Sequence, residues 1–155
     1  MMWNNEIIFA AVLQDLSQGK RAKLAGTGTS MEPTIHADTD KLVLAAPDAL
    51  QLGQICLYRR PGGGYAIHRI QSITKKRVVL LGDNQLKTET VAPEQVLAQV
   101  VAIERDGSTI DTTAADFLRK GYRANQRRLR QFRRRALRYQ LINFPRRLLK
   151  KLIKK

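Results

Sequence analysis

The regular spacing of turn-forming residues constrains the fold of this chain most strongly. Between residues 23 and 111, runs rich in apolar residues alternate with turns such as Pro61-Gly62-Gly63-Gly64, at intervals of roughly ten residues. Several short strands joined by such turns are typical of a small β-barrel or β-sandwich. We therefore predict a mainly β fold with strands at residues 23–27, 41–44, 54–59, 65–73, 77–81, 96–104 and 108–111.

Helices are predicted at the two ends of the chain. Apolar residues recur at helical spacing within residues 3–18, and Gly19 marks the end of that helix. This helix either packs on one side of the β domain or contacts a membrane. Residues 117–142 predict a second helix, which is broken at Asn143-Phe144-Pro145 and followed by a further helix. The expected parts are an N-terminal helix (1–20), a β domain (21–112) and a helical tail (113–155).

Charge is distributed very unevenly along the 155 residues. Residues 1–116 carry 12 Lys or Arg and 13 Asp or Glu, whereas residues 117–155 carry 16 Lys or Arg and no acid. An electrostatic partner therefore belongs to the tail. An anionic membrane surface is the first expectation, because the tail also has an apolar stripe. Nucleic acid is the second, and a partner protein or a solvated extension are the others. The stripe consists of Leu148, Leu149, Leu152 and Ile153.

Cysteine usage and hydropathy indicate a reducing compartment. Cys56 is the only cysteine, which excludes an internal disulfide, and its apolar neighbours predict a buried thiol. The longest N-terminal apolar run, from Ile7 to Leu13, is far shorter than the ~20 residues that cross a membrane. Because no export signal is recognisable, we expect a cytoplasmic protein or one bound peripherally to the inner face of the membrane. Two histidines and one cysteine lack zinc-site spacing, so neither a metal nor a cofactor is expected.

The segment from Gly28 to Ile35 is a candidate site because it combines a glycine-rich approach, Ser30 and a proline. Gly28 permits unusual backbone conformations, and Pro33 restricts both itself and the residue before it. The turn could present a serine hydroxyl for chemistry or be an ordinary surface turn. His68 shares a strand face with Ala66 and Ile70. That pattern suits a buried core histidine as well as a catalytic base.

Three short motifs occur in order along the predicted β domain. They are Ser30-Met31-Glu32-Pro33-Thr34, Ile67-His68-Arg69-Ile70 and Gly82-Asp83-Asn84. Residues 24–105 thereby resemble the type I signal peptidase superfamily, which includes the LexA-type self-cleaving repressors. Two flanking segments, Leu52-Gly53-Gln54-Ile55 and residues 91–103, fit the same frame.

The resemblance implies a serine endopeptidase that removes a leader or prosequence from a protein or peptide substrate. It assigns Ser30 as the nucleophile and His68 as the general base, at a position where bacterial signal peptidases and LexA-type repressors have a lysine. A histidine at this position resembles the endoplasmic-reticulum branch. Either Asp83 or Glu89 would orient the imidazole, and both alternatives stay open. Met31 and Pro33 are expected to contact the substrate.

A second hypothesis from the same resemblance is a regulator. The chain would then be a self-cleaving or non-catalytic LexA-like protein whose basic tail binds nucleic acid. Only about 22 residues precede the predicted β domain, which is too few for the helix-turn-helix domain of such repressors. A third hypothesis is a degenerate peptidase fold used as a scaffold, against which the presence of both Ser30 and His68 counts.

Overall fold

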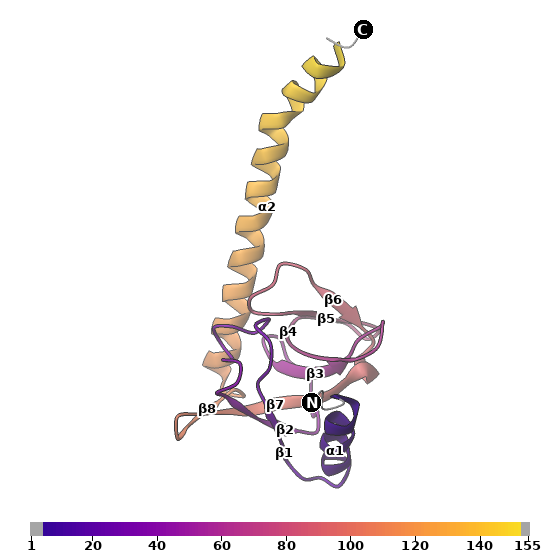
Figure 1. Cartoon of the computed structure of the whole chain (residues 1–155), viewed down its shortest axis with the longest axis vertical. Coiled ribbons are helices and arrows are strands. Elements are labelled where there is room, and N and C mark those ends of the chain that lie inside the picture. The colour runs from indigo at the N-terminus through magenta and orange to yellow at the C-terminus, as the bar shows by residue number, and fades with distance from the viewer. Residues whose placement is uncertain (1–4, 153–155) are drawn as a thin grey trace.

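The architecture is a single antiparallel sheet with one helix at each end of the chain (Figure 1). It comes from a computed structural model, which describes the backbone of residues 5–152 and the side chains of residues 6–139. The mainly β fold class predicted from the sequence is confirmed. The elements are α1 (Asn5–Ser17), β1 (Ala22–Ala25), β2 (Lys41–Ala45), β3 (Ile55–Arg59), β4 (Tyr65–Ile73), β5 (Val78–Leu81), β6 (Glu89–Val91), η1 (Pro93–Gln95), β7 (Val96–Arg105), β8 (Ser108–Asp111) and α2 (Ala115–Leu152).

The long strand β7 organises the sheet. It pairs with β2, β3 and β8, and the sheet runs in the order β1-β2-β7-β3-β4-β5-β6. Register shifts interrupt the pairing of β2 with β7, of β3 with β7 and of β4 with β5. Such bulges bend strands and increase their twist, which lets one sheet coil around its own core.

Strict alternation along β3 divides the core between the two faces of the sheet. Ile55 and Leu57 belong to one hydrophobic cluster, whereas Cys56 and Tyr58 belong to the other. All four side chains are fully buried. Because side chains on a strand alternate between faces, β3 has an apolar layer on both sides and is a central strand. The buried state of the Cys56 thiol agrees with the sequence prediction.

Helix α1 packs on the first of these clusters through Val12 and Leu16, which are 5% and 6% exposed. The prediction of a packing helix is therefore confirmed. Its outer side leaves Ile7 69% exposed and Ile8 38% exposed. Phe9 packs against the same cluster as Val12 and Leu16, and the centre of its ring is 4.4 Å from that of Tyr65 in β4.

The predicted strands all form, and two of them, residues 65–73 and 108–111, have the predicted bounds. One strand was missed. β6 has only three residues, and only Val91 is buried, so it has no periodic pattern that could be recognised in the sequence. This omission matters because β6 carries Glu89.

Helix α2 is continuous from Ala115 to Leu152, so the predicted break at Asn143-Phe144-Pro145 is wrong. A proline lacks its own N–H and removes one i to i−4 hydrogen bond, and here the backbone on both sides keeps helical geometry. The predicted apolar stripe from Leu148 to Ile153 lies outside the described side chains. No helix within residues 5–152 is long and apolar enough to cross a membrane.

The first turns of α2 belong to the β domain rather than to a separate tail. Leu118 is 8% exposed, and its backbone carbonyl packs against Gly53. A Cβ atom added at Gly53 would lie only 2.2 Å from the carbonyl oxygen of Leu118. Beyond these turns the helix projects away from the sheet (Figure 1). The predicted boundary at residue 113 therefore marks the start of the helix and not the end of the packed unit.

Candidate functional site

The Ser30 turn packs directly against the Gly82-Asp83-Asn84 segment. The backbone N–H of Asn84 donates to the carbonyl oxygen of Ser30 at 2.8 Å, and the Asn84 side chain donates to the carbonyl of Thr29 at 3.2 Å. A Cβ at Gly82 would lie 2.6 Å from the Ser30 carbonyl oxygen, so this approach requires glycine. Two of the three predicted motifs, more than fifty residues apart in the sequence, therefore meet in space.

Asp83 is buried and fully occupied by structural hydrogen bonds. Arg69 holds it with an Nη2 to Oδ2 distance of 2.7 Å and an Nε to Oδ1 distance of 2.9 Å. The Thr34 hydroxyl donates to Asp83 at 2.5 Å, and the Asn125 amide donates at 2.8 Å. Asp83 thus ties the Ser30 turn to β4 and α2, and it makes no hydrogen bond to His68.

His68 lies in β4 and is completely buried, on the same face as Ala66 and Ile70 as predicted. Its Nδ1 atom is 2.7 Å from the hydroxyl oxygen of Tyr58, and its buried Nε2 atom has no hydrogen-bond partner. Burial lowers the pKa of His68 below its ordinary value and outweighs the opposing charges of Glu89 and Asp83. The imidazole is therefore neutral at pH 7.

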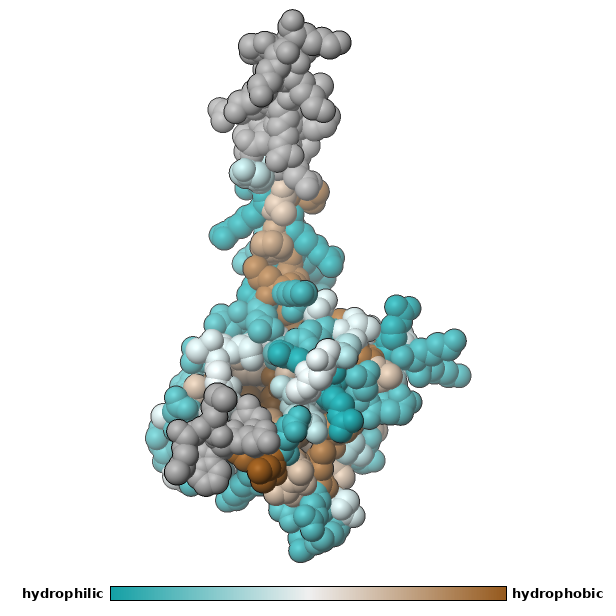
Figure 2. Space-filling model, turned by 45° about the vertical axis from the view of Figure 1, so that its right-hand side comes forward, coloured by the Kyte–Doolittle hydropathy of each residue, from teal (hydrophilic) through white to brown (hydrophobic). Residues whose placement is uncertain are grey.

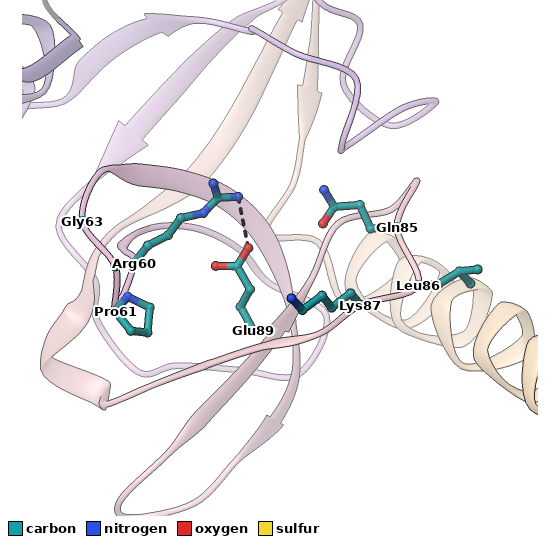
Figure 3. A pocket seen from close by; sticks show the side chains of 8 residues that line it. Arg60, Pro61, Gly63, Gln85, Leu86, Lys87 and Glu89 are labelled. Carbon is teal, nitrogen blue, oxygen red and sulfur yellow. Dashed lines mark ion pairs between the residues drawn. The ribbon is translucent and has the colours of Figure 1, made fainter.

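Charged groups lie around Tyr58, the hydrogen-bond partner of His68. Burial raises the pKa of the Tyr58 phenol, and the charge and hydrogen bonding of Glu89 raise it further. Glu89 is in turn paired with Arg60, with an Nη2 to Oε1 distance of 3.0 Å (Figure 3). Tyr58 has a single hydroxyl hydrogen, which it can give either to Glu89 or to Nδ1 of His68. When this hydrogen points to Glu89, the Tyr58 oxygen accepts the Nδ1 proton of His68, and the lone pair is on Nε2.

Gly82 connects the Ser30 turn to the sheet. It follows Leu81, which pairs with Arg69 at the end of the β4–β5 ladder, and the Ser30 carbonyl packs on it. The Ser30 side chain is half-buried. No hydrogen bond joins it to His68, because Nε2 has no partner. The two residues of the predicted pair are thus not joined by a hydrogen bond in this structure.

Two hollows adjoin these residues and share Arg60 as a wall. The smaller, about 150 Å³, is lined by Ser30 and Met31 together with apolar side chains that include Ile67 and Phe9. The larger, about 670 Å³, is open and lies over Glu89 and Lys87 (Figure 3). Met31 is thus placed beside a hollow, while Pro33 is exposed and lines neither.

Sequence reasoning missed Tyr58, Asn125 and Arg128. Arg128 donates from Nη2 to the Gly82 carbonyl at 2.9 Å, so α2 holds both Gly82 and Asp83. Two signals were present. Tyr58 belongs to the strand that was expected to precede the His68 hairpin, where side chains on one face interact across strands. Asn125 is a polar residue placed at helical spacing between the apolar Tyr122 and Leu129.

Comparisons with protein-family models, with curated proteins and with solved structures found no match for this chain.

Proposed function

We propose that this protein is a serine endopeptidase of the signal-peptidase type that removes a leader or prosequence from a protein or peptide. One observation carries the proposal. His68 is buried and neutral, its Nδ1 is engaged by Tyr58, and its Nε2 is left without a partner, in the strand whose pairing with β5 leads to the Gly82 on which Ser30 packs. A buried polar atom without a partner is rare in proteins and needs an explanation. A role of Nε2 as the general base, which accepts a proton only during the reaction, is such an explanation.

In this mechanism the Ser30 hydroxyl attacks the scissile carbonyl while Nε2 of His68 takes its proton. The backbone N–H of Ser30 stabilises the oxyanion of the tetrahedral intermediate. The imidazolium then gives the proton to the leaving amine, which leaves an ester on Ser30. Water hydrolyses this ester by the same proton transfers and releases the second product. Hydrogen bonds between catalytic groups often form or shorten only when substrate binds. The proposal therefore expects the Ser30–His68 hydrogen bond to form in the complex with substrate.

Tyr58 and Glu89 assist this base in the proposal. Tyr58 keeps the proton on Nδ1, and the nearby charge of Glu89 stabilises the imidazolium that forms. Of the two acids that the sequence left open, Glu89 therefore acts on His68 through Tyr58. Asp83 positions the Ser30 turn. The small hollow beside Ser30 and Met31 receives one substrate side chain.

The test is digestion of a complex peptide mixture by the full chain, with the products identified by mass spectrometry. We expect cleavage by the wild type and none by Ser30→Ala or His68→Ala. Ser72→Ala and His36→Ala are matched controls, because both residues are exposed and lie outside the site. Cleavage that persists in either site variant would refute the mechanism. Incubation of the chain without peptides distinguishes self-cleavage, since a regulator of the LexA type would fragment itself.

A further inference from the structure

Helix α2 presents two opposite faces. One face, at helical spacing, is turned to the β domain. It contains Leu118 and Asn125, which are buried, and Leu129, which is partly buried. The opposite side consists of exposed arginines, again at helical spacing. We call this side the arginine face, which consists of Arg123, Arg127, Arg130, Arg134 and Arg138. At 3.6 residues per turn, Arg127 lies about 160–200° from both Asn125 and Leu129, so the arginine face points directly away from the domain.

The arginine face is long, straight and free of acidic residues. From Arg123 to Arg138 it extends about 22 Å at the rise of an α-helix. The last acid of the whole sequence is Asp116, and it is already paired with Arg119 and Lys120. Figure 2 shows hydrophilic side chains projecting from both sides of this helix where it leaves the domain. Such a concentration of one sign of charge attracts an anionic partner of matching length.

An exposed apolar side chain at the edge of the arginine face favours one kind of anionic partner. Leu137 is 59% exposed and follows Arg130 and Arg134 by seven and three residues, which places it beside them at the edge of the face. Phe132 is 50% exposed but lies seven residues after Asn125, on the opposite side of the helix. A bilayer takes a side chain such as that of Leu137 below its phosphates while the arginines remain at the headgroups. Phosphate contacts to nucleic acid make no use of an aliphatic side chain.

We propose that the arginine face of α2 docks on an anionic lipid bilayer and holds the β domain on the side away from the membrane. The geometry permits this without a clash, because the domain packs on the opposite side of the helix. This docking surface lies in residues 123–138, upstream of the stripe at Leu148–Ile153 that the sequence suggested. The proposal does not depend on peptidase activity.

Sedimentation of the full chain with vesicles tests the docking. The probes are vesicles of phosphatidylcholine alone and vesicles with about 30% phosphatidylglycerol, whose negative surface potential attracts basic segments. We expect binding to the anionic vesicles only, weakened by added salt. Arg130→Glu with Arg134→Glu should reduce the affinity about tenfold or more. Lys75→Glu with Lys76→Glu changes the net charge equally on the exposed β4–β5 turn and should bind like the wild type.

Leu137→Gln separates a bilayer from other polyanions, and a short DNA duplex serves as the competing probe. We expect the variant to bind anionic vesicles about threefold more weakly and to bind DNA like the wild type. Equal vesicle binding by the wild type and the arginine double variant would overturn the proposal. The proposal would also be overturned if the wild type bound DNA more tightly than anionic vesicles and if Leu137→Gln did not change vesicle binding. Circular dichroism spectra that match the wild type show that each variant is folded.

Discussion

The Tyr58 hydroxyl lies 2.7 Å from Nδ1 of His68 in a part of the molecule that is closed to solvent. In the proposed mechanism this contact holds the proton on Nδ1 and leaves the lone pair on Nε2. Among the described side chains, Tyr58 is the only one that hydrogen-bonds the imidazole. The proposal therefore assigns the choice of tautomer to the phenol, whose pKa the nearby Glu89 raises and which lies beside the Glu89–Arg60 ion pair.

Tyr58→Phe removes this hydrogen bond and keeps the aromatic ring. We expect the rate of peptide cleavage to fall about tenfold to a hundredfold, because both tautomers of His68 are then populated and the imidazolium loses its partner. The free energy of unfolding should change by only about 1 kcal/mol. Cleavage rates across a pH series provide the measurement, since a purely structural role would leave the shape of the pH profile unchanged. Tyr122→Phe, in α2 and outside both hollows, is the matched control and should retain activity.

The pH dependence of stability follows from the lowered pKa of His68. In the unfolded chain His68 is protonated with its ordinary pKa of 6.5, whereas in the folded chain its pKa is lower and it stays neutral to a lower pH. The contribution of His68 to stability is therefore complete above 6.5 and is lost as the pH falls through the folded pKa. Urea denaturation between about pH 5 and pH 8 should show this loss in the wild type and a smaller one in His68→Gln. Parallel curves for the two proteins would contradict the prediction, and His36→Gln should behave like the wild type.

Arg69→Met should be among the most destabilising substitutions in the chain. Arg69 is 1% exposed, and its removal leaves the carboxylate of Asp83 buried without its cationic partner. Breaking a buried ion pair on one side costs about 3–5 kcal/mol. Lys23→Met removes one partner of the exposed Lys23–Glu104 pair and should cost less than about 1 kcal/mol. The free energies of unfolding of both variants, measured in urea, check this difference.

Gly82→Ala should displace the Ser30 turn. The new Cβ would lie 2.6 Å from the Ser30 carbonyl oxygen, a contact that only a shift of the backbone can relieve. A displacement of about 1 Å at a reacting group can reduce a rate about a hundredfold, so peptide cleavage should fall by at least about tenfold. Gly62→Ala is the control, because nothing lies within 4 Å of a Cβ at that position. Equal cleavage rates for the two variants would show that the Gly82 contact does not position Ser30.

Much of the fold was accessible from local sequence patterns. The alternation of β4 predicted the faces of His68 and Ile70, and the turn residues predicted all strands except β6. Both signals are local, since they depend on the period of two along a strand and on the backbone preferences of glycine and proline. The bounds of α2 were less accessible. Pro145 predicted a break, whereas the backbone there stays helical.

The sequence by itself determined the mainly β fold, the neutral domain with its cationic tail, and the order of the motifs around Ser30, His68 and Asp83. Only the tertiary structure decided what each group touches. Strand pairing brings Tyr58 to His68, and the packing of α2 brings Asn125 and Arg128 to Asp83 and Gly82. These contacts join residues 10 to 46 positions apart, and burial then removes the water that would otherwise compete for them. Hydrogen-bond partners at such separations depend on register and helix packing, for which a local sequence pattern carries no signal.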